Sequence, residues 1–274
     1  MLSHHQIISR RLLLSVAGLG LLSATACQSS VPSPGDGAGA GAAKGGSAGA
    51  TPGAAPASTP AVNAPSPLLS PGPPQPRRVT NPLFSLAADD KLVALTIDDG
   101  PDPANTPEVL SILQNYGIRA TFFLIGENAA RQAGLVKEIA AHGHHIANHT
   151  WSHPDLRGLA ESKVRDELQR TSDLLHDTTG RTPTWFRAPG GDWSDVSLQV
   201  SAALGMRPMG WSVDPQDWAR PGTSKITTRV LQAIGPGSIV LNHDGGGDRS
   251  QTIAALRSYL PVLIDEGYRF TAPQ

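Results

Sequence analysis

Hydrophobic and polar positions follow two different spacings along residues 91–272. Short apolar runs such as "KLVALTID" and "ATFFLIG" have the length of buried strands, whereas segments such as "AESKVRDELQRTSDLLHDTTG" repeat apolar residues at helical spacing and end on glycine. The predicted strands cover residues 91–98, 120–126, 144–150, 184–191, 206–214, 237–244 and 268–272. The predicted helices cover residues 106–117, 128–143, 160–180, 194–205, 224–235 and 251–267.

Strands and helices alternate through this region, which is typical of a parallel sheet covered by helices. We therefore predict a distorted (β/α) barrel of about seven parallel strands rather than an open sheet. Polar clusters follow several strands, namely "DDG", "NHTWSH", "RAPGG", "DPQDW" and "NHD". Because the carboxyl ends of parallel strands meet at one edge, where barrels build their active sites, we expect these clusters to converge.

The amino terminus has the pattern of an export signal. In residues 1–27, Arg10 and Arg11 precede the apolar run "LLLSVAGLGLL", which is too short for a spanning helix and ends in small residues before Cys27. "SRRLLL" resembles a twin-arginine signal, and an ordinary Sec signal is the alternative. "ATAC" resembles a lipobox, in which Cys27, the only cysteine of the chain, would be lipidated. The alternative is that Cys27 is an incidental small residue of the signal.

Residues 28–80 are dominated by Pro, Ala, Gly and Ser and are predicted to form a flexible tether, because they can bury too little apolar surface to fold. Residues 81–274 are long enough for one domain. We expect an exported monomer that is secreted or held at the outer face of a membrane only through its lipidated amino terminus. The net charge of −1 gives no basic surface for nucleic acid.

Two histidines and a pair of aspartates predict a metal site. His149 and His153 have H-x-x-x-H spacing, which places both imidazoles on one face if their loop enters a helical turn. Alone, they could be two surface histidines. One carboxylate of Asp98 and Asp99 would complete three ligands with an open fourth position, as in catalytic zinc sites, and the other could accept a proton from water. Zinc, cobalt or nickel suits this set of ligands.

With these residues in place, the chain resembles the polysaccharide deacetylases, the NodB-homology group of carbohydrate esterase family four. The resemblance covers nearly the whole domain through five motifs in order: "TIDDG", "HTWSH", "RAPGG", "DPQDW" and "LNH". It implies that Asp98 is the general base, that Asp99, His149 and His153 bind the metal, and that His243 is the general acid.

Further residues of the motifs have expected supporting roles. Arg187 would keep Asp98 ionised and oriented, the alternative being an ordinary ion pair on a loop. A carboxylate should raise the pKa of His243, and Asp217 is preferred over Asp214 for this role. Trp218 and Leu241 would line the pocket for the acetyl methyl group, unless they only pack in the core.

One position departs from the family pattern. Gly190 stands where the family often has tyrosine, whose backbone N–H helps to hold the oxyanion. The N–H remains, so the departure affects the expected substrate preference more than catalysis. His142, His144 and His145 are predicted to be solvent-facing or helix-terminal rather than metal ligands.

The resemblance implies a metal-dependent hydrolase that removes N-acetyl groups from an N-acetylglucosamine-containing polysaccharide such as peptidoglycan or a chitin-like polymer. An O-deacetylase of acetylxylan is the alternative enzyme. A non-catalytic glycan-binding lipoprotein and a metal-scavenging surface protein are less consistent with the sequence, because the expected base, ligands and acid are all present.

Overall fold

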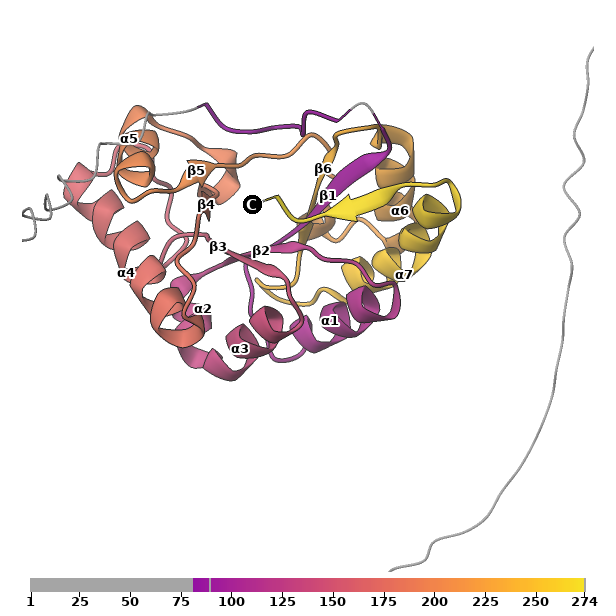
Figure 1. The fold of residues 1–274 in the computed structure, drawn as a ribbon, viewed down its shortest axis with the longest axis horizontal. Coiled ribbons are helices and arrows are strands. Elements are labelled where there is room, and N and C mark those ends of the chain that lie inside the picture. The colour runs from indigo at the N-terminus through magenta and orange to yellow at the C-terminus, as the bar shows by residue number, and fades with distance from the viewer. Residues whose placement is uncertain (1–80, 89, 274) are drawn as a thin grey trace, which may run out of the picture. The chain divides into compact units, whose positions relative to one another are not determined.

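The computed structural model describes residues 81–88 and 90–273 (Figure 1). The predicted export signal, Cys27 and the predicted tether at residues 28–80 lie outside the described residues. Among the residues described, no helix has the length and apolar character needed to cross a membrane.

The predicted parallel sheet is confirmed, and it curls into a half-barrel. Its strands run in the order β5-β4-β3-β2-β1-β6, with β7 also paired to β1, and every ladder is parallel. The strands are β1 (Leu92–Asp98), β2 (Thr121–Leu124), β3 (His145–Asn148), β4 (Trp185–Phe186), β5 (Arg207–Pro208), β6 (Ile239–His243) and β7 (Arg269–Thr271).

Residues 83–85 lie across the open side of the half-barrel, and we call them the strap. Leu83 forms a bridge with Met209 just after β5, and Ser85 forms a bridge with Ser238 just before β6. A further parallel bridge joins Val213 to Val240 of β6. No continuous ladder joins β5 to β6 in the described part of the chain, so these single bridges close the barrel there.

Helices cover the outer face of the sheet, as predicted (Figure 1). They are α1 (Thr106–Asn115), α2 (Gly126–Arg131), α3 (Ala133–Ala141), α4 (Glu161–Thr179), α5 (Asp195–Ala203), α6 (Thr223–Ala233) and α7 (Ser250–Asp265), with short 3-10 turns η1 (Pro189–Gly191) and η2 (Asp217–Ala219).

The one helix predicted over residues 128–143 is two helices. Gln132 has a non-helical backbone (φ −126°, ψ 43°) and separates α2 from α3. At the start of α2, the N–H groups of Gly126 and Glu127 donate to the carbonyl oxygens of Thr150 and Trp151. Because these bonds fix α2 against the loop after β3, the chain must change direction before α3 can cover the sheet.

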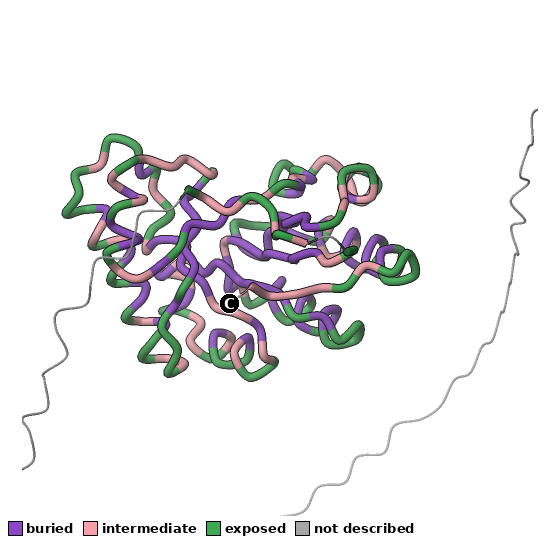
Figure 2. Tube along the Cα trace, turned by 45° about the horizontal axis from the view of Figure 1, so that its top comes forward, coloured by how far each residue is buried: buried purple, intermediate pink, exposed green. Residues whose placement is uncertain are grey.

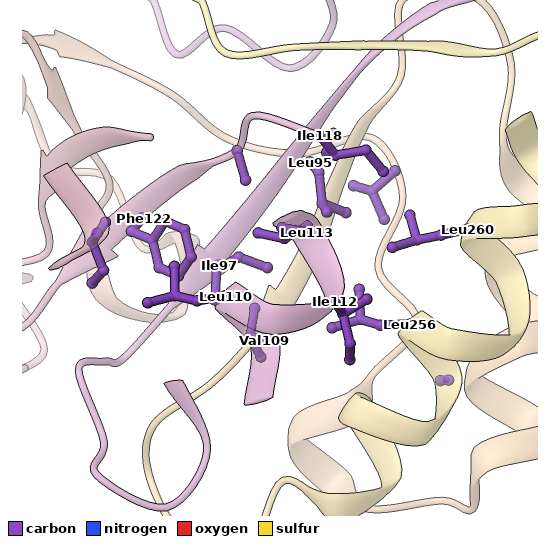
Figure 3. Packing of buried hydrophobic residues seen from close by; sticks show 14 of the residues in the cluster. Leu95, Ile97, Val109, Leu110, Ile112, Leu113, Ile118, Phe122, Leu256 and Leu260 are labelled. Carbon is purple, nitrogen blue, oxygen red and sulfur yellow. The ribbon is translucent and has the colours of Figure 1, made fainter. Parts of the chain in front are cut away.

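Alternation along the strands separates two layers of side chains. Leu95 and Ile97 of β1 point outward and pack with α1 and α7, including Val109 and Leu256, in the main core (Figure 3). Residues of the opposite parity point into the half-barrel, where Ala94 and Phe123 belong to a second cluster. Figure 2 shows buried chain gathered along the strands and exposed chain on the outer turns of the helices. The side chains that point into the half-barrel continue to the carboxyl ends of the strands, where they become polar.

We expect Leu256→Ala to lower the free energy of unfolding by about 2–5 kcal/mol, because Leu256 is fully buried between α7 and the sheet. Ile264→Ala on the same helix is the control, since Ile264 is 37% exposed and should cost less than about 1 kcal/mol. Urea unfolding of both variants measures the difference. Equal losses would contradict the assignment of the main core.

Candidate active site

Asp98 and Asp99 reach the same pocket because the strand ends between them. Asp98 is the last residue of β1, and Asp99 has a left-handed backbone (φ 73°) that turns its side chain out of the strand alternation. Gly245 lies against this turn, where an added Cβ would stand 2.2 Å from the carbonyl oxygen of Asp99. The turn at Asp99 therefore needs a glycine at position 245, in the loop after β6. The same turn brings the two neighbouring carboxylates, Asp98 and Asp99, to one cavity.

Asp99, His149 and His153 form the expected three-residue cluster. One ligand atom from each lies within 4.8 Å of the others. The Oδ1 atom of Asp99 is 3.4 Å from Nε2 of His149 and 3.3 Å from Nε2 of His153. The loop does not enter a helical turn, which corrects that prediction: His153 has φ 58° and Thr150 has φ 69°. The Thr150 hydroxyl accepts the His153 N–H at 3.0 Å and holds this conformation.

The chemistry of the three side chains fits a divalent metal. The backbone oxygen of Arg187 can only accept a hydrogen bond, so Nδ1 of His149, 2.8 Å away, carries the proton and Nε2 faces Asp99 with a lone pair. The Oδ1 atom of Asp99 is buried without a hydrogen-bond partner. Acceptors that face one another at this distance are stabilised by a proton or a metal cation between them, and one carboxylate with two imidazoles is a typical zinc ligand set.

The protonation states agree with this arrangement. Burial alone would raise the pKa of Asp99, but the neighbouring imidazoles, His149 first, bring the pKa below its usual value. Burial, together with the charge of His149, lowers the pKa of His153. An ionised carboxylate and a neutral imidazole are the forms that bind metals.

Asp98 is held by a buried arginine. Its Oδ1 atom accepts a hydrogen bond from Nη1 of Arg187 at 2.6 Å, and its Oδ2 atom lies 3.7 Å from Nε2 of His149. Arg187 is fully buried, so it is not the ordinary loop ion pair that was the alternative. Its remaining donors bond the Thr96 hydroxyl and the carbonyl oxygens of Met209 and Gly210 at 2.8–3.0 Å.

His243 stands beside Asp98 on the neighbouring strand and is paired with Asp217. The Cα atoms of Asp98 and His243 are register partners of β1 and β6. Asp217 accepts hydrogen bonds from Nδ1 of His243 at 2.7 Å and from its backbone N–H at 2.8 Å. Burial would lower the pKa of His243, but this hydrogen bond and the surrounding carboxylates raise it to about 9.

Asp214 does not contact His243. Its Oδ1 atom accepts the Gln216 N–H at 2.7 Å, where the chain turns toward η2. Asp214 lines the pocket, but Asp217 alone of these two residues occupies the position beside the imidazole. The geometry therefore agrees with the preference for Asp217 over Asp214.

The two carboxylates and the three histidines border one cavity of about 360 Å³, which is lined by Asp98, Asp99, His149, His153 and His243. Its apolar side is formed by Leu241, which is buried, and Trp218, which is 53% exposed and thus not a core residue. Gly190, which has a left-handed backbone (φ 64°), also borders the cavity. Trp211 borders it as well. A small acyl group could lie between the apolar side and the two carboxylates.

Sequence reasoning missed the residues that hold the metal-ligand loop. Glu167 of α4 accepts the N–H groups of Trp151 and Ser152 and the Ser152 hydroxyl, each at 2.8 Å. Asn128 of α2 donates to the carbonyl oxygen of Asp99 at 2.8 Å. Neither residue belongs to a strand end, and only the packing of the helices against the loop reveals them.

The prediction that His142, His144 and His145 are solvent-facing or helix-terminal is only partly correct. His142 ends α3, as expected, and His145 begins β3 and is half-buried. His144 is buried instead of solvent-facing, because its Nδ1 accepts the N–H of Ala120 at 3.2 Å and its ring packs on Phe122.

Comparison with known proteins agrees with the fold. Residues 86–209 match the model of the polysaccharide deacetylase family. A chitooligosaccharide deacetylase of Bradyrhizobium sp. (strain ANU 289) is 41% identical over 205 residues, which are 68% of this chain and 94% of that protein. A peptidoglycan-N-acetylglucosamine deacetylase of Bacillus cereus (strain ATCC 14579) is 41% identical over 184 residues, 66% of this chain and 86% of that protein.

A solved structure shows the same arrangement of the chain. The crystal structure of the Bc1960 peptidoglycan N-acetylglucosamine deacetylase superposes with a TM-score of 0.67 at 37% identity, over 69% of this chain and 89% of that one. The relatives are matched over most of their own length, and the curled parallel sheet is shared. The chain belongs to the polysaccharide deacetylase family.

Proposed function

We propose that this protein is a metal-dependent deacetylase that hydrolyses N-acetyl groups of an N-acetylglucosamine-containing glycan, such as peptidoglycan or a chitin-like polymer. One observation carries the proposal: a three-residue metal cluster, a buried carboxylate and a carboxylate-paired imidazole border the same cavity. The substrates named for the relatives support the choice of glycan.

Asp99, His149 and His153 would hold the metal. Zinc is the first choice, and cobalt or nickel also suits the ligands. The bound metal would polarise the acetyl carbonyl and acidify a water molecule. Asp98, held in place by Arg187, would take the proton of the attacking water through its Oδ2 atom, which faces the cluster.

The remaining groups act on the acetyl carbon and the leaving amine. The backbone N–H of Gly190 borders the cavity and would donate to the developing oxyanion. Trp218 and Leu241 receive the acetyl methyl group. His243, held in its cationic form by Asp217, protonates the sugar nitrogen as the carbon–nitrogen bond breaks, because an amine anion is a very poor leaving group.

Acetate release by the purified protein tests the substrate class. N-acetylglucosamine oligomers and peptidoglycan should be deacetylated, whereas acetylxylan is the substrate of the alternative O-deacetylase. If none of the three releases acetate in the presence of zinc, cobalt or nickel, a non-catalytic glycan-binding protein becomes the better interpretation.

We also propose that the protein is exported and is either secreted or lipid-anchored through Cys27. The support is the sequence pattern of residues 1–27 alone. Mass spectrometry of the mature amino terminus would identify a lipidated Cys27 or a different cleavage site.

Asp98→Asn and Asp99→Asn should have different effects. Asp98→Asn should keep the metal but lower kcat by about two to four decades, because an amide cannot accept the proton. Asp99→Asn should lose metal, and excess metal should restore part of its activity. Metal content and acetate release, measured on both variants, separate the two roles. Metal loss confined to Asp98→Asn would reverse the assignment.

Glu167→Gln should weaken metal binding by about tenfold, since an amide cannot satisfy the three donors of the ligand loop. Glu161→Gln on the same helix is the control, because Glu161 pairs only with Arg165 at the surface. Competition with a fluorescent chelator measures the affinity. Equal affinities in the two variants would remove Glu167 from a positioning role.

Asp217→Asn should shift the alkaline limb of kcat/KM to lower pH. The general acid must be protonated, and without Asp217 burial is left to lower the pKa of His243 from about 9. Loss of a neighbouring charge typically moves a pKa by about one to three units. Asp214→Asn should leave the limb in place. A pH profile that is the same for wild type and Asp217→Asn would argue against His243 as the acid.

A further inference from the structure

A second cavity, of about 610 Å³, opens at the edge of the sheet opposite the catalytic pocket. We call it the amino-edge cleft and define it by Arg119, His144, His145, Arg181 and Thr184. These residues precede or begin β2, β3 and β4. Along β3, His145 and the metal-cluster residue His149 are separated by roughly 13 Å. The cleft therefore shares no residue with the catalytic pocket.

The cleft is lined by positive charge without acidic partners. Arg119 and Arg181 are exposed, and within the described residues neither guanidinium forms an ion pair. No aspartate or glutamate of the described chain lines the cleft. Adjoining hollows add His142 next to Arg119 and Lys137 next to Arg181. The two cleft arginines differ in this from the exposed Arg165 and Arg257, each of which pairs with a glutamate.

A buried histidine supplies a neutral donor in the same cleft. His144 is 2% exposed, and its Nδ1 accepts the N–H of Ala120, so Nε2 carries the ring proton. Burial, with the charges of His142 and Arg119, lowers its pKa to about 4, which keeps this tautomer neutral at physiological pH. No hydrogen bond within the described chain uses the Nε2–H, and the ring lines the cleft.

We propose that the amino-edge cleft is a binding site for an oxyanion, either phosphate or carboxylate, carried on a small molecule or on a residue of a polymer. Arg119 and Arg181 pair with the anion, and the Nε2–H of His144 and the Thr184 hydroxyl donate to it. Arginine is suited to both oxyanions because its planar donors bind two oxygens at once. The volume of the cleft falls in the range of small-molecule sites, so a group larger than the bare anion can enter.

The site has no part in the proposed deacetylation. It lies at the opposite ends of the strands, so an anion there cannot reach Asp98 or His243. Its effect would be to retain the enzyme on an anionic ligand. The proposal therefore stands or falls independently of the proposed function.

Calorimetric titration of the metal-loaded protein with inorganic phosphate, and separately with succinate, tests the site at fixed ionic strength. Excess acetohydroxamate occupies the metal, so that the catalytic pocket takes up neither anion. We expect wild type to bind at least one of the two, and the double variant Arg119→Gln/Arg181→Gln to bind it at least tenfold more weakly. Arg119→Lys/Arg181→Lys should keep part of the affinity.

The control is Arg165→Gln/Arg257→Gln, which removes the same charge from two exposed positions outside the cleft. It should bind like wild type, and both double variants should retain deacetylase activity. The proposal is overturned if wild type binds neither anion, if the cleft variant binds as tightly as wild type, or if the control loses as much affinity.

Discussion

The buried ion pair between Asp98 and Arg187 is the interaction on which the site depends. A charged guanidinium inside the half-barrel is tolerated because each of its three nitrogens donates to an acceptor, and breaking such a pair typically costs about 3–5 kcal/mol. Phe123 covers one face of the guanidinium, with its ring centroid 4.1 Å away. Through its side chain and its own carbonyl oxygen, Arg187 joins β1, the segment after β5 and His149. The proposed base, one expected metal ligand and the barrel wall are thus fixed by a single residue.

Much of this arrangement could be predicted because it follows from local patterns. The period of two along β1 and β6 places Asp98 and His243 on one side of neighbouring strands, and parallel pairing brings their ends together. The positions of the polar clusters at the strand ends therefore predicted that the clusters converge, whereas the role of each residue was implied by the family resemblance. Chemistry predicted a carboxylate beside His243, and the structure places Asp217 there, after a left-handed turn at Gln216 (φ 55°).

The parts that could not be predicted depend on contacts between distant segments. Left-handed backbones at Thr150 and His153 are unfavourable for these residue types, so a helical turn was the natural expectation. Glu167 of α4 offsets the cost of these left-handed backbones, because its carboxylate accepts two N–H groups of the loop after β3. His144 is polar and adjoins two further histidines, which predicts exposure. It is buried because the edge N–H of Ala120 needs an acceptor.

The strap across the open side of the half-barrel determines how pulling forces would enter the domain. Three backbone hydrogen bonds join Leu83 of the strap, and Leu86 directly after it, to the chain around β5 and β6. They run from the Leu83 N–H to Pro208, from the Gly210 N–H to Leu83 and from the Leu86 N–H to Gly237. Tension applied from the amino-terminal side would therefore load the seam of the barrel before it reached β1. The proposed catalytic residues on β1 and β6 lie beyond that seam, so the strap would take up such tension before the tension reached them.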